Sequence, residues 1–203
     1  MLISPALTGF GTGLSLIVAI GAQNAYILRQ GITRQHVWVA VALCAISDAL
    51  LIAAGIAGIG ALIERAAWIL PIARIGGAAF LASYAIFALR RALKPSFISA
   101  GQNPASSSLA RVILTTLALT WLNPHVYLDT VLLLGSIGNS FGTDRWIFAM
   151  GAIGASLVWF SALGAASGML SKVFSNPRAW QVLDLVICIF MCYLAIELAR
   201  PLF

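Results

Sequence analysis

Two short polar segments interrupt the most apolar parts of this 203-residue chain, and they hold the residue types best suited to binding a ligand. They are residues 21–31 (GAQNAYILRQG) and 120–129 (TWLNPHVYLD). In each segment amide side chains, which donate and accept hydrogen bonds, stand beside residues that loosen or break a helix. Such interruptions at matched places in the two halves of an apolar chain predict a ligand site where two broken helices meet.

The residue types in these segments divide into three sets. The candidates for binding a substrate or a proton are Gln23, Asn24 and Asn123, those for breaking a helix are Gly21, Ala22 and Pro124, and those for lining a path are Tyr26, Trp121 and Tyr127. Pro124 removes one backbone donor and leaves carbonyls near Thr120 without their usual partners, although a simple proline kink is the alternative interpretation. Together the amides suit the ammonium and carboxylate groups of a zwitterion.

Two aspartates add charge to this chemistry. Asp48 lies in the middle of a long apolar stretch, where an ionised side chain is costly and is by default a functional hypothesis. We interpret it as an anionic site for a cation, a proton or both in turn, and an ion pair with Arg74 is the structural alternative. Asp129 follows Pro124 by about one to two helical turns and is the second candidate acid. A helix-end or interfacial role is its alternative.

The elements that position these residues are predicted to be membrane-spanning helices. Hydrophobic residues make up 61% of the chain and charged residues only 9%, against about 25% charged in a soluble domain. Mean hydropathy is +0.99. The apolar runs are continuous over about 20 residues, as helices need, and do not alternate in polarity as barrel strands do. Six runs are predicted, at 4–28, 37–63, 67–89, 112–134, 146–170 and 180–199. We therefore expect an all-α integral membrane protein that retains its first helix.

The distribution of Lys and Arg predicts the orientation of these helices. The connections after the first, third and fifth runs hold Arg29, Arg34, Arg90, Arg91, Lys94, Arg111, Lys172 and Arg178. The opposite side holds Arg65, Arg145 and Arg200, and Arg74 is ambiguous because it lies inside the third run. Because cytoplasmic loops are enriched in basic residues, we expect both termini on the periplasmic side. The net charge of +6 is spread over loops rather than gathered on one face, so we expect no nucleic-acid partner.

The chain also divides into two halves of three runs each. A polar linker at 95–110 separates residues 1–94 from residues 111–203. Three spans per half make the second half enter the membrane from the opposite side, which is the layout of an inverted repeat. Weak internal similarity supports a duplication, since NAYIL at 24–28 echoes NPHVYL at 123–128. We therefore expect six transmembrane helices arranged as two inverted three-helix repeats.

Other chemistries have less support from the residue types. Cys44, Cys188 and Cys192 form no Cys-x-x-Cys pair, which argues against a redox carrier. His125 is the only deep imidazole, so we expect no metal site, and no motif indicates a cofactor. A small intramembrane enzyme that uses His125 stays open as an alternative, although no serine stands in a recognisable nucleophile elbow.

The interrupted segments also resemble a known family. Residues 21–31, the Ser47-Asp48 pair and residues 120–129 resemble, in order and spacing, three landmarks of the LysE-type lysine/arginine exporters, and the resemblance covers essentially the whole chain. It implies efflux of L-arginine or L-lysine across an inner membrane, coupled to protons or to the membrane potential, with Asp48 and Asp129 as functional acids. A cationic side chain also suits a carboxylate in a low-dielectric site on physical grounds alone. Export of neutral amino acids or of a metal cation is the alternative, and a homo-oligomer is left open.

Overall fold

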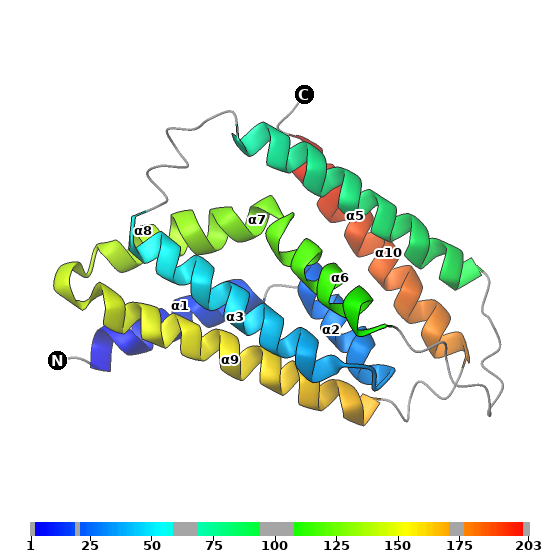
Figure 1. Ribbon diagram of the computed structural model, residues 1–203, viewed down its shortest axis with the longest axis horizontal. Helices are drawn as coiled ribbons and strands as arrows, with labels where there is room; N and C mark the ends of the chain where they lie inside the picture. Colours follow the sequence, from blue (N-terminus) through cyan, green and yellow to red (C-terminus); the bar gives the residue numbers. More distant parts are fainter. Residues whose placement is uncertain (1–2, 19–20, 59–68, 94–107, 171–176, 201–203) are drawn as a thin grey trace.

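The computed structural model describes residues 3–18, 21–58, 69–93, 108–170 and 177–200, and these residues form helices and short turns (Figure 1). In chain order the elements are α1 (Ile3–Val18), α2 (Ala22–Ile32), α3 (Val37–Ile56), α5 (Ile69–Leu93), α6 (Leu109–Trp121), α7 (Pro124–Val126), the π-helix η1 (Tyr127–Leu133), α8 (Leu134–Asn139), the 3₁₀-helix η2 (Gly142–Asp144), α9 (Arg145–Leu170) and α10 (Pro177–Ala199). The all-helical prediction is confirmed for these residues. Most of the predicted linker, residues 95–107, lies outside them.

Several of these helices have the length and composition needed to cross a membrane. Within the described ranges they are Val37–Ile56, Gly142–Met169 and Arg178–Glu197. The helices Ser4–Val18 and Ala22–Ile32, whose axes differ by 75°, together make a fourth candidate span. The fourth predicted run, 112–134, is divided instead among α6, α7, η1 and the first residue of α8, because the helix ends at Trp121 and resumes at Pro124.

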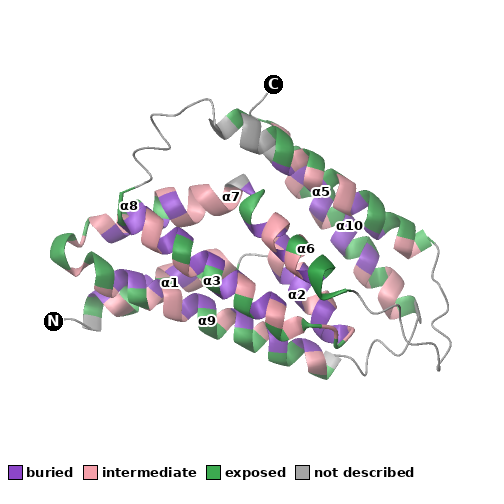
Figure 2. Cartoon of the chain, in the orientation of Figure 1, coloured by how far each residue is buried: buried purple, intermediate pink, exposed green. Residues whose placement is uncertain are grey.

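The helices of the first half pack mainly against those of the second half. Helix α1 lies along α9, α5 lies along α10, and α3 lies between α9 on one side and the α6–α8 region on the other (Figure 1). The larger buried cluster draws residues from both halves, among them Ile27, Cys44, Leu81, Phe160 and Met191. Figure 2 shows the buried residues on the sides of the helices that face one another. The core is therefore shared between the halves.

Glycines bring α3 unusually close to the helices that follow α7. A Cβ atom added at Gly55 would lie 2.7 Å from the carbonyl oxygen of Val131, and one added at Gly135 would lie 2.8 Å from the carbonyl carbon of Gly55. The Nδ2 of Asn139 bridges this contact by donating to the carbonyl oxygens of Gly55, at 3.3 Å, and Gly135, at 2.9 Å. Small residues at such crossings are typical of helices that pack in membranes.

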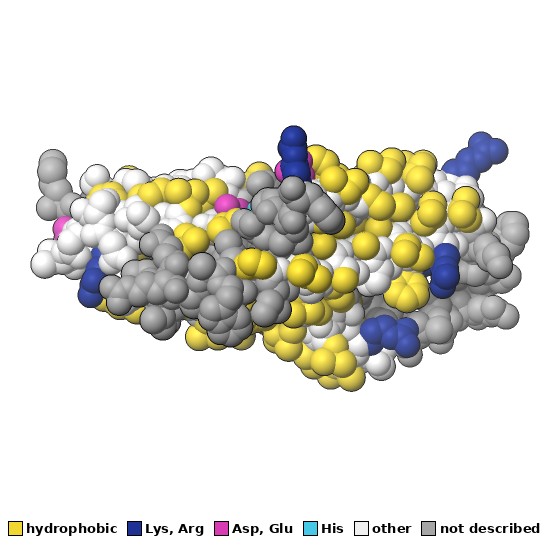
Figure 3. All heavy atoms as spheres, turned by 90° about the horizontal axis from the view of Figure 1, so that it is seen from above, with side chains coloured by type: hydrophobic (Ala, Val, Ile, Leu, Met, Phe, Trp, Pro, Cys, Tyr) yellow, Lys and Arg dark blue, Asp and Glu magenta, His cyan; other side chains and the backbone are white. Residues whose placement is uncertain are grey.

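The outer surface of the bundle is strongly apolar. Large hydrophobic side chains on several helices are more than half exposed, including Ile46, Leu50, Met150, Leu157 and Ile189. Figure 3 shows hydrophobic side chains spread over much of one face of the protein. A surface of this kind is costly in water and is satisfied by lipid.

Candidate functional site

One cavity of about 290 Å³ collects the polar residues of both interrupted segments. Its lining residues are Leu16, Ile17, Gly21, Gln23, Asn24, Asp48, Asn123, His125, Val126, Asp129, Thr130, Tyr193, Leu194 and Glu197. The structure thus places all five predicted binding residues around one space. They come from α2, α3, η1 and the connection between α6 and α7, and the end of α10 adds three side chains that the sequence analysis did not single out, Tyr193, Leu194 and Glu197.

The first interrupted segment reaches the cavity because the chain changes direction there. Helix α1 ends at Val18, and α2 begins at Ala22 behind Gly21, which has extended backbone angles (φ −113°, ψ 167°) and offers no side-chain cap. The Nδ2 of Asn24 donates to the carbonyl oxygen of Ile17 at 3.0 Å and so ties the start of α2 back to α1. The indole Nε1 of Trp159 donates to the Oδ1 of Asn24 at 3.2 Å.

A direct hydrogen bond joins the two interrupted segments. The Nε2 of Gln23 donates to the Oγ1 of Thr120 at 2.6 Å, across 97 positions of sequence. That hydroxyl in turn donates to the carbonyl oxygen of Thr116 at 2.9 Å. The first turn of α2 is therefore anchored to the last turns of α6, next to the place where α6 ends.

The second interrupted segment continues as irregular helix. The Oδ1 of Asn123 accepts a hydrogen bond from the backbone N–H of His125 at 3.2 Å, and Pro124 is the first residue of α7. The chain then runs as a π-helix from Tyr127 to Leu133, which contains the half-buried Asp129. π-helical turns are rare and occur frequently at functional sites, where they re-aim side chains.

Asp48 is the most deeply buried acid of the cavity. It is 4% exposed, and its Oδ2 accepts a hydrogen bond from the Oγ of Ser156 on α9 at 2.8 Å. No ion pair to Asp48 occurs among the described side chains. The side chain of Arg74, its predicted alternative partner, lies outside the described residues. A buried carboxylate without a cation favours a cationic ligand.

The charge of the lining is predominantly negative. Asp48, Asp129 and Glu197 are acids, and Glu197 also lies 3.4 Å from the guanidinium of Arg200. Among the described lining residues, His125 is the one side chain that can become cationic. No group of three or more His, Cys, Asp or Glu residues within the described ranges is arranged to hold a metal ion.

The three aromatic candidates for a path lie outside this cavity lining. Tyr26 is buried against Tyr84, with ring centroids 6.4 Å apart and an interplanar angle of 75°. The hydroxyl of Tyr127 donates to the carbonyl oxygen of Trp121 at 2.9 Å. The indole Nε1 of Trp121 donates to the Oγ of Ser47, the neighbour of Asp48, at 3.1 Å. All three therefore pack around the interrupted segments.

Comparison with known proteins identifies the family. The family model described as LysE type translocator matches residues 14–201, which include every lining residue of the cavity. The chain belongs to the LysE-type translocator family. With its apolar spanning helices, this makes it a multi-pass membrane protein.

Relatives of this LysE-type translocator match it over nearly their full length. A protein of Mycobacterium tuberculosis named "Putative amino-acid transporter" is 47% identical over 90% of both chains. The "Arginine exporter protein ArgO" of Yersinia enterocolitica is 42% identical over 96% of this chain and 95% of its own. The protein of that name from Klebsiella pneumoniae is 40% identical over 95% of this chain and 92% of its own. No solved structure matches the chain.

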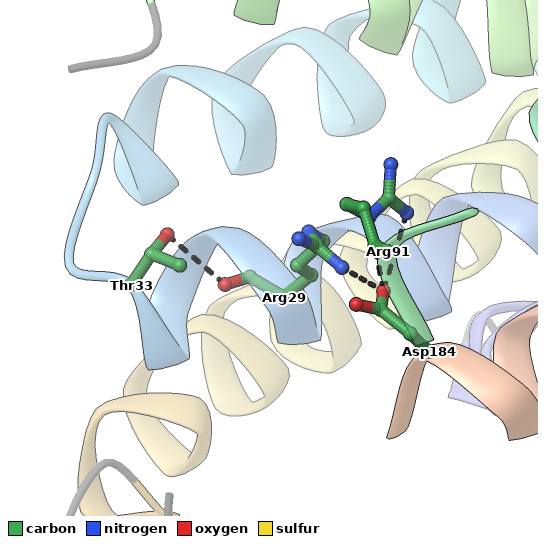
Figure 4. A network of polar contacts seen from close by, with 4 residues as sticks. All are labelled: Arg29, Thr33, Arg91 and Asp184. Carbon is green, nitrogen blue, oxygen red and sulfur yellow. Dashed lines mark hydrogen bonds and ion pairs between the residues drawn. The ribbon is translucent and has the colours of Figure 1, made fainter. Parts of the chain in front are cut away.

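This LysE-type translocator also contains an ionic cluster that the sequence analysis missed. Asp184 of α10 lies between Arg29 of α2 and Arg91 of α5 (Figure 4). Its Oδ1 accepts hydrogen bonds from the Nη1 of Arg29 and from the Nε of Arg91, the latter at 3.2 Å. The guanidinium carbon of Arg29 lies 5.8 Å from the centre of the Trp180 ring. The cluster therefore joins α2 to the α5–α10 pair.

The sequence analysis missed this cluster because its members lie in different predicted elements. Arg29 and Arg91 were interpreted as loop charges, whereas Asp184 lies inside the predicted sixth run, where an ionisable residue was itself a signal. Asp184 is near the start of α10 and Glu197 near its end, about 20 Å apart at the usual helical rise. The cluster and the cavity thus occupy opposite ends of this helix.

Proposed function

We propose that this protein is a secondary transporter that exports basic L-amino acids, arginine or lysine, across the inner membrane. The observation that carries the proposal is the single cavity in which Asp48 and Asp129 lie together with amides from both interrupted segments. The family membership and the relatives named as arginine exporters support it. A cation with hydrogen-bonding ends is the ligand that matches such a lining.

The residues take different roles in this proposal. Asp48 binds the cationic side chain of the substrate in the driest part of the cavity, where the attraction is least screened. Asp129 provides the second acid. A carboxylate that binds a substrate cation and a proton in turn would couple export to protons, and the membrane potential is the alternative coupling force. Gln23, Asn24 and Asn123 bind the polar groups of the substrate backbone.

We also propose that residues 1–94 and 111–203 are two inverted three-helix repeats joined by the linker at 95–110. The packing partners support this symmetry. In this symmetry α1 and α2 correspond to the α6–α8 region, α3 corresponds to α9, and α5 corresponds to α10. The contact of α1 with α9 is then equivalent to the contact of the α6–α8 region with α3. The contacts of α3 with α9 and of α5 with α10 each join two equivalent helices. The breaks at Gly21 and Ala22 and at Pro124 are then equivalent features of the two repeats, as in other carriers built from broken helices.

The orientation follows from the basic residues, with both termini proposed to be periplasmic. Arg29 and Arg91, which belong to two connections on the same predicted side, both contact Asp184, and this proximity supports a common cytoplasmic location. Tyr26, Trp121 and Tyr127 stay candidates for a path beyond the cavity rather than for its lining.

The test is counterflow of radiolabelled L-arginine into proteoliposomes that hold the purified protein and unlabelled L-arginine. We expect L-lysine added outside to compete with the label, and L-threonine and divalent metal ions not to compete. Competition by threonine would assign the protein to export of neutral amino acids, and competition by a metal ion would assign it to metal export. Either result, or a lack of arginine counterflow, contradicts the proposed substrate class.

A further inference from the structure

The cavity contains one buried nitrogen atom that has no hydrogen-bond partner. It is the Nε2 of His125, a residue of the cavity lining, and neighbouring atoms cover this nitrogen almost completely. Buried polar atoms in folded proteins are nearly always hydrogen-bonded, so an orphan atom of this kind needs an explanation. A ligand that occupies the cavity is the simplest one.

Several other polar groups of the lining already have partners within the protein. The Asn24 amide uses both ends, with its Nδ2 bonded to Ile17 and its Oδ1 bonded to Trp159. The Nε2 of Gln23 donates to Thr120, and the carboxylate of Asp48 accepts from Ser156. The backbone N–H of His125 donates to Asn123, and the Nε2 of its ring makes no hydrogen bond to a described residue, although Asp129 lies near enough to interact with this side chain electrostatically.

The charge of the cavity favours a carboxylate as the partner of this nitrogen. An amino acid carries a carboxylate at one end, and the three acids of the lining repel it. The hydroxyls of Thr130 and Tyr193 can donate, but they carry no charge. Imidazole donates from Nε2 either as the neutral tautomer protonated there or as the cation. A carboxylate bound at Nε2 lies in the one place of the described lining where a positive charge can form.

We propose that the Nε2 of His125 binds the α-carboxylate of the transported amino acid and thereby selects amino acids over the corresponding amines. This inference adds a binding contact to the proposed function. It rests on that proposal in one respect, because the substrate must be an amino acid. Asp48 then binds the cationic side chain and His125 supplies the charged contact to the carboxylate, while the amides of the two interrupted segments make the remaining polar contacts to the substrate backbone. His125 is a specificity residue because it contacts the α-carboxylate, which every amino acid has and which the corresponding decarboxylated amine lacks.

The test compares equilibrium binding of L-arginine and agmatine, which is arginine without its carboxylate, to the purified protein in detergent. A hydrogen bond to a charged group accounts for roughly a 10- to 100-fold preference, so the wild type should prefer arginine by about that factor. His125→Ala should bring the arginine-to-agmatine ratio close to one and leave agmatine affinity nearly unchanged. His125→Gln keeps an amide donor and should retain part of the ratio.

Val126→Ala is the matched control, because this neighbouring apolar side chain also lines the cavity. It should change the affinity of both ligands by the same factor, and gel filtration checks that each variant is folded. Equal loss of both ligands in His125→Ala, or a wild type without preference for arginine, overturns the proposal about His125.

The two proposals fail in different ways. A wild type that binds a neutral amino acid instead of arginine contradicts the proposed substrate class, and the same comparison with that amino acid and its amine still tests His125. A wild type that binds no amino acid overturns both proposals.

Discussion

Replacing Asp184 with Asn should destabilise the protein, because one buried carboxylate serves two guanidinium groups. The Asp184 side chain is 6% exposed, Arg29 is 19% exposed and Arg91 is 36% exposed. Removing one partner of a buried ion pair costs about 3–5 kcal/mol, since the other charge stays buried without compensation. A pair as exposed as that of Arg91 adds only up to about 1 kcal/mol. We therefore expect a loss of about 3 kcal/mol, most of it from Arg29.

Thermal unfolding of the purified protein in detergent, followed by tryptophan fluorescence, measures this loss. For a chain of this length 1 kcal/mol corresponds to about 2–4 °C, so Asp184→Asn should lower Tm by about 6–12 °C. Arg91→Gln is the matched control and should lower Tm by no more than about 4 °C. Replacing the buried pair with apolar residues, as Arg29→Met together with Asp184→Leu, should restore most of the stability lost in Asp184→Asn.

Two outcomes would refute this reasoning. A Tm for Asp184→Asn close to that of the wild type would mean that Arg29 is not buried against this carboxylate in the membrane protein. A double variant at least as unstable as Asp184→Asn would mean that the loss arises from packing around α10 and not from an uncompensated charge.

Three further predictions concern single side chains, the first two tested by thermal unfolding in detergent and the third by uptake into proteoliposomes. Gly55→Ala places a methyl group 2.7 Å from a carbonyl oxygen of η1 and should cost about 1–3 kcal/mol in unfolding, whereas Gly11→Ala, whose Cβ meets nothing within 4 Å, should be neutral or slightly stabilising. Equal Tm values for the two would contradict the close crossing. Ser156→Ala removes the 2.8 Å donor to Asp48 and should cost about 1.5–3 kcal/mol, and an unchanged Tm would argue against that bond. Asn123→Ala should weaken arginine uptake while the yield of folded protein on gel filtration stays near wild type, and loss of the folded protein would make the break purely structural.

The features predicted from sequence are those that local composition encodes. Continuous apolar runs predict helices, and the all-helical fold agrees in the residues described. The Gly21 and Pro124 positions mark interruptions because glycine and proline act on their own backbone. Buried amides and acids are conspicuous in such a chain, so Gln23 and Asp48 were found without any knowledge of their partners.

The features that were missed depend on tertiary packing. The π-helix η1 is a backbone register that residue types between Tyr127 and Leu133 do not specify. Glu197 belongs to the cavity because the end of α10 meets residues of α2 and η1 around the same space, although these elements are far apart in sequence. Asp184 is a different case, since the cost of an ionisable residue within an apolar run applied to it as much as to Asp48.

The central claim is that the acidic cavity binds a basic amino acid through Asp48, and L-arginine counterflow with matched amounts of wild-type and Asp48→Asn protein tests it most directly. The side-chain amide of asparagine is nearly the same size as the carboxylate of Asp48, so the variant should insert and fold. Because the amide carries no charge, arginine counterflow should fall to the level of empty liposomes. Counterflow by Asp48→Asn at the wild-type rate would contradict the claim.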